Sequence, residues 1–395
     1  MSIESEAPAG DVVDHGPMTV PRDAEVDQPV SPSPKRWIPW TALLVYAAVR
    51  AVTVGIVAVA DLWTHNSLLY DLDVWDGAWF LRVVAHGYPS RLPMVGGHVA
   101  ANPIAFFPFF PLLVRGLDTT GISPGFSVLV VSGITGAAAV VAVGLLARRI
   151  AGDDAGGRAA LLFAVCPGSF AFSLGYAEGV LVTCVALGLI ALLDRRWLAA
   201  GLLGAVATAS SPMALAFVVS CCWCAGRSVV VDRKLRAAVA PLLAPLGFVA
   251  YMAYLRIHTG QLMAWRLTER GGWKGYPSLA YPVRILTTFL GDPIRPTLTG
   301  QILFFGTVAA VAGVVLMVKE RQPAAVLSYG VTSLVLAAIS APVGLRPRFL
   351  MLAFPIVIAL ATRYRGRTHR WLVGISAVLL LGVSVLELAS RAVFP

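Results

Sequence analysis

Long apolar runs alternate with short polar turns over most of the chain. A membrane-spanning helix needs about 20 predominantly apolar residues, and runs of this kind recur from residue 37 to residue 389. The pattern predicts an all-α polytopic membrane protein with about eleven membrane segments. We place these segments at residues 37–60, 124–147, 159–176, 179–193, 197–210, 212–226, 237–255, 299–318, 323–341, 349–362 and 371–389.

Several of these segments are shorter than a full crossing, particularly the pair that meets at Ser210, Ser211 and Pro212. Short helices are tolerated inside a membrane where they line a cavity in the protein instead of facing lipid. We therefore expect some of these helices to border a cavity.

The first 36 residues differ from the rest of the chain. They are rich in Pro, Asp, Glu and Ser, so they cannot bury enough apolar area to offset the entropy lost on ordering. We expect a disordered cytoplasmic tail at residues 1–36, followed by one membrane-embedded domain at residues 37–395. Because the first apolar run comes after this tail, we expect it to stay as an anchor and not to be cleaved as a signal peptide.

Composition agrees with a membrane protein. Hydrophobic residues make up 57% of the chain, charged residues only 13%, and mean hydropathy is +0.77, which is too apolar for one soluble globule. The net charge of +10 could suggest nucleic acid as a partner. However, Lys and Arg occur in short clusters between apolar runs and not on one amphipathic face, so we read them as topology signals and expect no nucleic-acid partner.

These basic clusters give the orientation. If the tail is cytoplasmic, each short turn on the inner side carries Lys or Arg, as the positive-inside rule requires. Two long segments, residues 61–123 and 256–298, then lie outside and are dense in aromatic residues, Gly and Pro. We therefore predict a multi-pass plasma-membrane protein whose functional residues lie on the outer face.

The first outer segment carries three carboxylates, Asp71, Asp73 and Asp76, directly after the first span. Neighbouring carboxylates repel one another, and desolvation raises the pKa of the most buried one, which can make it a general base near neutral pH. Asp76, between Trp75 and Gly77, is our candidate base, with Asp73 as a supporting residue. The alternative is an inert acidic loop at the interface.

Three further charged residues lie next to apolar segments. Glu178 falls where two spans meet with almost no loop, and an ionisable residue at membrane depth indicates a functional site. The alternative is a carboxylate that caps a helix start. Arg346 and Arg348 precede an outer-face apolar run, where a guanidinium fork suits a phosphate. Simple interfacial anchoring is the alternative, and Arg348 is the preferred phosphate ligand.

The second outer segment interleaves aromatic rings with charges. Trp273 could contact a sugar ring, and Arg270 and Lys274 could meet a lipid phosphate or merely anionic headgroups. The histidines, His86 among them, are too scattered for metal-ligand spacing. No nucleotide-binding or phosphate-cradling motif is present, so we expect no metal and no cofactor.

At these residues the chain resembles the PIG-V-type mannosyltransferases, which include the enzyme that adds the second mannose of glycosylphosphatidylinositol anchors, and their bacterial relatives. Pieces of the resemblance follow one another in the same order over nearly the whole membrane region. They are Trp75 and Asp76, His86 to Tyr88, residues 106–111, 173–179, 196–210, 254–265 and 348–355.

The resemblance implies the GT-C glycosyltransferase fold and a polyprenyl-phosphate sugar as donor, most specifically polyprenyl-phosphate mannose. It implies a membrane glycolipid or glycan as acceptor, and an inverting displacement with Asp76 as the acidic residue. Glu178 and Arg348 lie in matching stretches, and His86, Tyr88 and Trp273 are candidates for acceptor contacts. Relatives often have Thr-Arg-Pro where this chain has Ser210, Ser211 and Pro212.

A lipid or solute transporter is the main alternative, because charged residues at broken helices also occur in transporters. The chain shows no evident internal repeat, and its polar residues concentrate on one face instead of the midplane. A non-enzymatic assembly subunit of the cell envelope is a further alternative.

Overall fold

The computed structural model describes residues 37–64, 75–291 and 297–389. The predicted tail at residues 1–36 lies outside this part of the chain, and so do Asp71 and Asp73. The first half of the described chain contains α1 (Trp40–Thr64), α3 (Asp76–His86), β1 (Met94–Val95), β2 (His98–Val99), η1 (Pro103–Ala105), α4 (Phe109–Asp118), α5 (Pro124–Ala151), α6 (Asp153–Ala164), η2 (Pro167–Ser173), α7 (Glu178–Leu193) and α8 (Trp197–Ser210). The second half contains η3 (Pro212–Ala214), α9 (Leu215–Val230), η4 (Leu235–Ala238), α10 (Val239–Leu243), α11 (Leu246–Thr259), α12 (Ala264–Gly272), β3 (Tyr276–Pro277), α13 (Tyr281–Gly291), α14 (Leu298–Lys319), α15 (Ala324–Ile339), β4 (Ser340–Ala341), α16 (Pro347–Leu352), α17 (Pro355–Arg363), α18 (Gly366–Ser384) and η5 (Val385–Ala389).

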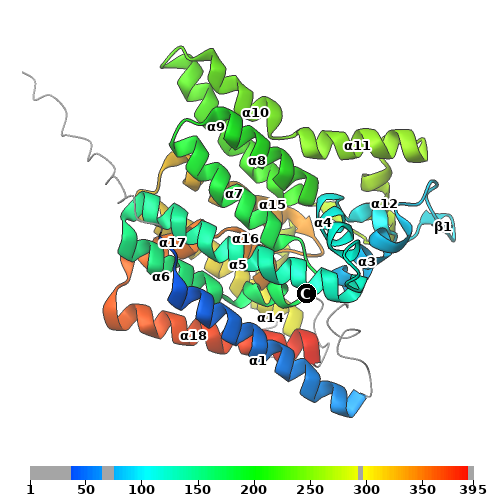
Figure 1. Ribbon diagram of the computed structural model, residues 1–395, viewed down its shortest axis with the longest axis horizontal. Helices are drawn as coiled ribbons and strands as arrows, with labels where there is room; N and C mark the ends of the chain where they lie inside the picture. Colours follow the sequence, from blue (N-terminus) through cyan, green and yellow to red (C-terminus); the bar gives the residue numbers. More distant parts are fainter. Residues whose placement is uncertain (1–36, 65–74, 292–296, 390–395) are drawn as a thin grey trace, which may run out of the picture.

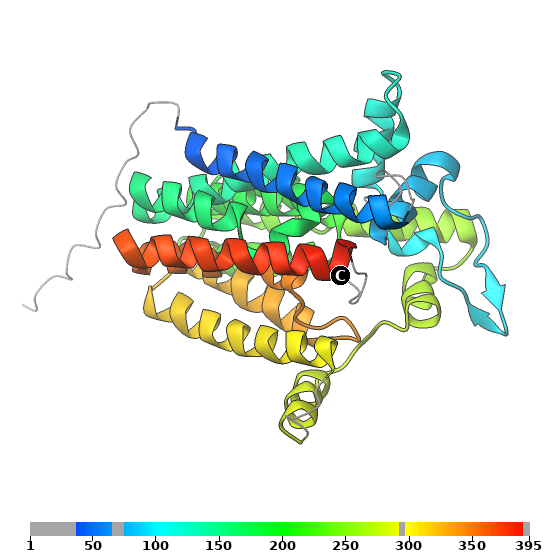
Figure 2. The ribbon, with the colours of Figure 1, turned by 90° about the horizontal axis from the view of Figure 1, so that it is seen from below.

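Long helices run side by side and form a bundle (Figures 1 and 2). Helices α5 to α8 are central, while α1 and α18 lie along one flank (Figure 1). The core between them is rich in small and aromatic side chains, including Ala139, Ala160, Phe163 and Phe172. Small residues let helix backbones approach closely, which is how helices pack where lipid supplies no hydrophobic drive.

Each of the predicted apolar segments falls on a helix or on a broken helix. Within the described residues, five helices are long and apolar enough to cross a membrane, or up to seven if each bent pair forms one span. Helices α7, α8 and α15 are apolar but shorter. The prediction of an all-α polytopic membrane protein is confirmed.

The predicted segment at residues 159–176 is not one straight helix. Helix α6 ends at Ala164, and η2 leaves it at an angle of 69°, because Pro167 cannot continue the hydrogen-bond ladder. A break inside a membrane leaves backbone carbonyls that need partners. Arg50 of α1 supplies them by donating to the Ser169 carbonyl and, at 3.2 Å, to the Ser169 hydroxyl.

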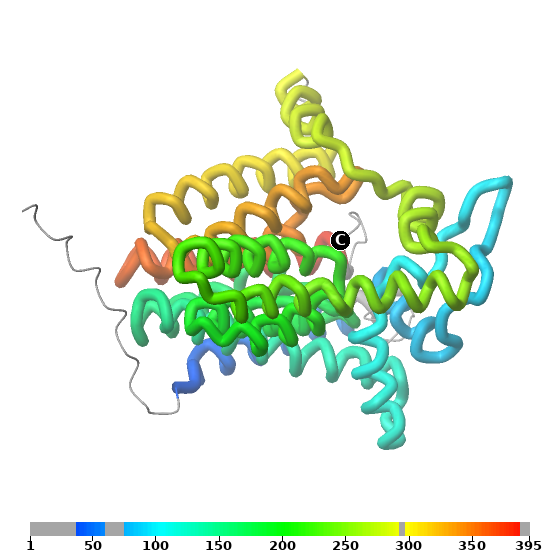
Figure 3. The backbone as a smooth tube through the Cα atoms, turned by 90° about the horizontal axis from the view of Figure 1, so that it is seen from above, coloured from blue at the N-terminus to red at the C-terminus, as the bar shows by residue number. Residues whose placement is uncertain are grey.

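Helices α3, α4, α12 and α13 lie at one end of the bundle, which we call the loop end (Figure 3). The turns between α14 and α15 and between α17 and α18 lie at the other end, and we call it the basic end (Figure 2). Lys319, Arg321, Arg363 and Arg365 lie in or beside these two turns. The two long segments predicted on one face therefore do share one end of the molecule.

Side-chain hydrogen bonds join the two long segments of the loop end. Tyr251 of α11 donates to the Ile104 carbonyl at 2.8 Å, and Asn102 donates to the Thr268 hydroxyl at 3.1 Å. A short strand pair, β3 with β4, joins the second segment to the turn before α16. The loop end is thus tied to the bundle at several points.

The five cysteines are free thiols in the structure. Cys166, Cys184 and Cys221 are buried, but Cys222 is exposed and Cys224 is half-buried. Cys222 and Cys224 both belong to α9, which therefore turns one side away from the bundle. An apolar sequence does not distinguish a side chain facing lipid from one facing another helix.

Candidate active site

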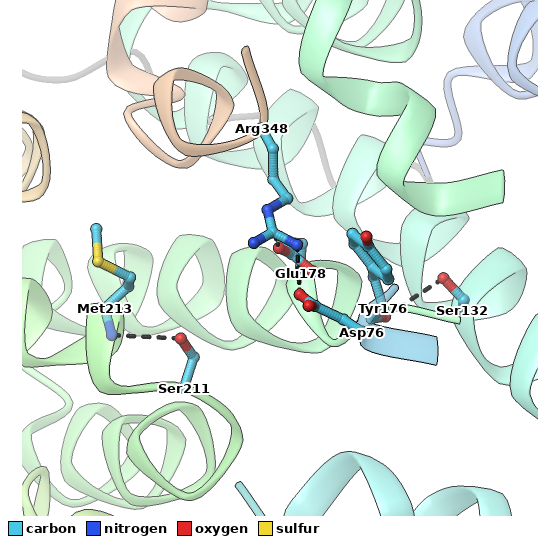
Figure 4. Close-up of polar contacts among 7 residues, drawn as sticks. All are labelled: Asp76, Ser132, Tyr176, Glu178, Ser211, Met213 and Arg348. Carbon is cyan, nitrogen blue, oxygen red and sulfur yellow. Dashed lines mark hydrogen bonds and ion pairs between the residues drawn. The ribbon is translucent and has the colours of Figure 1, made fainter. Parts of the chain in front are cut away.

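Three charged side chains from distant parts of the sequence meet near the loop end (Figure 4). The Nη1 atom of Arg348 donates to Asp76 Oδ2 at 2.5 Å, and its Nε lies 3.4 Å from Glu178 Oε1. The side chains of Arg348, Glu178 and Asp76 are 8%, 13% and 20% exposed. We call these three residues the charged triad.

Glycines allow the backbones that carry the triad to come together. A Cβ on Gly175 would lie 2.0 Å from Val128 and 3.3 Å from the Cα of Gly77, so the loop before Glu178 can approach the first turn of α3. A Cβ on Gly168 would lie 2.2 Å from the Pro347 carbonyl oxygen. The glycine at 168 therefore lets η2 pack against α16, which carries Arg348.

Helix starts position both carboxylates. Asp76 is the first residue of α3, and Glu178 is the first residue of α7. Free backbone N–H groups and the helix dipole favour negative charge there. The Arg348 guanidinium also lies 4.8 Å from the centre of the Tyr176 ring and 4.6 Å from that of Phe349, within cation–π distance.

The three charged side chains of the triad are largely buried, and a buried charge without a partner is costly. Removing one partner of a buried ion pair typically costs about 3–5 kcal/mol, since it leaves an uncompensated charge. Two carboxylates and one guanidinium give the triad a formal net charge of −1. One carboxylate is enough to balance Arg348, so the triad holds one negative charge in excess.

The Arg348 guanidinium has N–H donors that are not used within the triad. An arginine has five N–H donors in a planar fork; here Nη1 serves Asp76 while Nε faces Glu178. Within the described residues Nη2 has no hydrogen-bond partner. This geometry allows one guanidinium to hold a carboxylate and an incoming anionic oxygen at the same time.

Arg346 lies beside the triad, as its position in the sequence predicts. Arg346 is 8% exposed. Its pKa is lowered mainly by burial and further by the positive charge of Arg348. Glu387 of η5 is 2% exposed and interacts electrostatically with Arg346 and Arg348. Glu387 was not among the predicted site residues, although it is an acidic residue inside an apolar segment, which is the same signal that selected Glu178.

Trp273 belongs to an aromatic cluster next to Asp76. Its ring lies 5.2 Å from Trp79 and 5.6 Å from Phe106, both in edge-on contact. Its buried Nε1 has no hydrogen-bond partner in the described chain. Trp79 lies one turn after Asp76 on α3, so Trp273 is near the triad.

Glu269 of α12 lies in the same region and was not among the predicted site residues. Burial and the negative charge of Asp76 raise its pKa to about 7. A carboxylate with a pKa near neutrality is a competent proton acceptor. The sequence offers no signal that separates Glu269 from the neighbouring charges of an amphipathic segment.

His86 and Tyr88 lie apart from the triad, on the wall of a separate groove of about 450 Å³. His86 is exposed, whereas the Tyr88 hydroxyl is already occupied by the Phe106 carbonyl at 2.7 Å. The groove is lined by Trp79, Arg82, His86, Gly87, Tyr88, Pro89, Pro93, Ala101, Asn102 and Pro103. Because Trp79 also contacts Trp273, the groove begins next to the aromatic cluster.

Arg270 and Lys274 are exposed side chains at the end of α12. Neither makes an ion pair within the residues the structure describes. Ser211, where relatives often have Arg, caps η3 by accepting from the Met213 N–H at 3.3 Å (Figure 4). The structure therefore brings together Asp76, Glu178, Arg346 and Arg348 but leaves Arg270 and Lys274 at the surface.

Comparison with known proteins gives a likeness of fold. Neither protein-family models nor curated proteins match the chain. Among solved structures it is similar to ArnT from Cupriavidus metallidurans bound to undecaprenyl phosphate, with a TM-score of 0.50 and 14% identity over 90% of this chain and 73% of ArnT. The apo structure of the same ArnT gives 0.48, 14%, 90% and 72%. The chain is thus a multi-pass membrane protein that shares the fold of this ArnT structure.

Proposed function

We propose that this protein is a membrane glycosyltransferase that moves a sugar from a polyprenyl-phosphate carrier to an acceptor on the outer side of the plasma membrane. The charged triad is the observation that carries the proposal. It pairs a candidate base, Asp76, with a candidate phosphate ligand, Arg348, at 2.5 Å. The GT-C fold and the undecaprenyl phosphate bound to the similar ArnT structure support it.

The reaction is a single inverting displacement. The acceptor hydroxyl attacks the anomeric carbon and loses its proton to Asp76, while the bond from that carbon to the phosphate oxygen breaks. The electron pair leaves with the carrier phosphate, whose charge Arg348 stabilises through its remaining N–H donors. Glu178 keeps the guanidinium oriented from the other side.

Arg346, buried next to Arg348, is a second phosphate ligand in this proposal. Arg270 and Lys274 are exposed on the rim of the loop end, where they would attract the anionic headgroup of the donor. His86, Tyr88 and Trp273 would border the path of the acceptor, with His86 and Tyr88 in the groove and Trp273 at its inner end. Asp73, which lies outside the described residues, remains a candidate supporting carboxylate.

We further propose that the sugar is mannose and the acceptor a membrane glycolipid or glycan, as in the PIG-V-type enzymes. The resemblance supports this through three separate runs of sequence. Asp76, Glu178 and Arg348 each come from a different run, and the fold brings them into contact. Chance similarity in apolar stretches would not be expected to select three residues that meet.

The test is reconstitution of the purified protein in liposomes with undecaprenyl phosphate carrying radiolabelled mannose and a lipid extract of its native cells. We expect a new labelled lipid product with the parent protein and none with Asp76→Asn. Movement of labelled donor across the bilayer without any product would indicate a transporter instead. No product with mannose but product with another sugar on the same carrier would correct the donor assignment alone.

A further inference from the structure

Helix α12, which carries Glu269, is fixed against the first long segment of the loop end. Its Thr268 receives a hydrogen bond from Asn102, and both side chains are buried. A Cβ on Gly271 would lie 2.6 Å from the Val99 carbonyl oxygen, and one on Gly272 2.5 Å from the Cα of Ala101. These close backbone contacts allow little rotation of α12, so the direction of Glu269 is set by packing.

That direction is toward the start of α3. Trp273 is one turn after Glu269 and donates its backbone N–H to the Glu269 carbonyl, so the two share one side of α12. The Trp273 ring packs against Trp79 at 5.2 Å. Since Trp79 is one turn from Asp76 on α3, Glu269 and Asp76 lie on the sides of α12 and α3 that meet at this ring contact.

The chain turns back around the Glu269 carboxylate. Lys274 adopts a positive φ of 55°, and a Cβ on Gly275 would lie 3.0 Å from Glu269 Oε2. Within the described residues Glu269 makes no ion pair and its carboxylate has no hydrogen-bond partner. In this respect Glu269 differs from Asp153, Asp194 and Asp232, each of which is paired with an arginine.

The titratable and charged groups near Glu269 influence its pKa. Elements packed against α12 present His98 of β2 and Tyr251, Tyr254, Arg256 and His258 of α11, and η1 presents none. On its own helix and in the next turn stand Arg266, Arg270 and Lys274. Burial, and then the charge of Asp76, raise the pKa of Glu269 to about 7.

Building on the proposed glycosyltransferase function, we propose that Glu269 is the proton acceptor behind Asp76, receiving the proton that Asp76 removes from the acceptor hydroxyl. The acceptor O–H bond breaks as the new bond to the anomeric carbon forms and the bond to phosphate breaks. The proton passes from the Asp76 carboxyl to Glu269 and then to water. Asp76 is thereby returned to its ion pair with Arg348 before the next turnover.

This role follows from the way Asp76 is held. Its Oδ2 is occupied by Arg348 at 2.5 Å, so a proton left on Asp76 would weaken one of the two ion pairs of the buried guanidinium and leave Glu178 as its remaining carboxylate partner. Glu269 stands close enough for the two charges to interact and has no cation of its own to lose. Passing the proton onward therefore restores the ion pair between Asp76 and Arg348.

A pH–rate profile tests the proposal, with the liposome assay, undecaprenyl-phosphate mannose as donor and native lipid extract as acceptor. The rate of the parent protein should fall about tenfold per pH unit below about pH 7, because protonated Glu269 cannot accept a proton. Glu269→Gln should lower the rate at least about tenfold at pH 8 and lose this acid limb. Glu269→Asp should keep an acid limb with a shifted midpoint and a lower rate.

Asp118→Asn, a matched carboxylate-to-amide change at the end of α4 on the same end of the molecule, should leave both the rate and the limb unchanged. An acid limb that persists with the same midpoint in Glu269→Gln would overturn the proposal, as would a parental rate. If Glu269→Gln does not fold, an acid limb with an unshifted midpoint in Glu269→Asp would overturn the proposal in the same way. If the parent protein forms no product with any polyprenyl-phosphate sugar, that result would instead refute the glycosyltransferase function.

Discussion

At the scale of single residues, Arg348 is shared between two carboxylates, and its fork determines what it can still bind. Replacing Arg348 by Lys keeps the charge but offers three donors from one atom in place of a planar fork. We expect Arg348→Lys to keep the ion pair with Asp76 and to lose phosphate contact, raising the donor KM at least about tenfold, or about 1.4 kcal/mol. Titration of the donor in the liposome assay measures this.

Arg348→Ala should be worse in both respects, because it leaves Asp76 and Glu178 facing each other without a cation. Thermal unfolding of the purified variants separates the two effects. A parental donor KM in both variants would show that Arg348 does not contact the carrier phosphate.

Asp76 is the residue whose loss should affect the rate most. Asp76→Asn keeps the shape and one hydrogen-bond acceptor but cannot take a proton, so we expect the turnover rate to fall about 100-fold to 10,000-fold. Turnover at saturating donor is the measurement, with Asp118→Asn as the control. If Asp76→Asn turned over at the parental rate while Asp73→Asn was inactive, the base would be Asp73.

The sequence identifies single members of the site but not their contacts. Glu178 and Arg348 attract notice because a charge beside an apolar run is costly, and the structure places both at Asp76. Their ion pairs depend on close packing at Gly168 and Gly175, which no residue spacing reveals. Glu269 is missed because its burial comes from α12 docking against a distant segment.

At the scale of elements, the contact between η2 and α16 positions Arg348. Gly168→Ala would bring a methyl group to 2.2 Å from the Pro347 carbonyl oxygen, so backbone must move. We expect this substitution to lower the free energy of unfolding by about 1–3 kcal/mol and to reduce turnover by displacing Arg348. Thermal unfolding and the liposome assay measure the two effects.

Gly157→Ala is the matched control. Gly157 lies on α6, the helix that precedes η2, and a Cβ there would meet nothing within 4 Å. Alanine is also the better helix former, so stability and turnover should stay at parental values or rise slightly. Equal losses in both variants would mean that any change in this part of the chain is damaging, and that the η2–α16 contact has no special role.

The apolar runs predict where helices lie, but they do not predict where the helices break. Pro167 and Pro355 start new helices within predicted single segments, because a proline ends one ladder of hydrogen bonds and is readily accepted at the start of the next. Whether a membrane tolerates the break depends on partners such as Arg50, which comes from α1. Such a partner is distant in sequence and becomes visible only in the fold.

At the scale of the whole molecule, the basic turns and the candidate active site lie toward opposite ends. The basic turns gather at one end of the bundle, and α3, whose first residue is Asp76, lies at the loop end (Figure 1). From the positive-inside rule we predict that the basic end lies in the cytoplasm and the loop end outside. A donor carried by a polyprenyl phosphate would reach the triad from the outer leaflet.

Cysteine labelling in intact cells tests this orientation, in a background where all five native cysteines are replaced because Cys222 is exposed. Val95 in the β1–β2 hairpin and Leu279 before α13 are 71% and 82% exposed at the loop end, and Arg233 is exposed at the basic end. We expect Val95→Cys and Leu279→Cys to react with a membrane-impermeant maleimide, and Arg233→Cys to react only after permeabilisation. The native-cysteine-free parent controls for background labelling. Reaction of Arg233→Cys in intact cells, with protection of the other two, would invert the molecule and place the triad on the cytoplasmic side, where the donor would have to be presented by the inner leaflet.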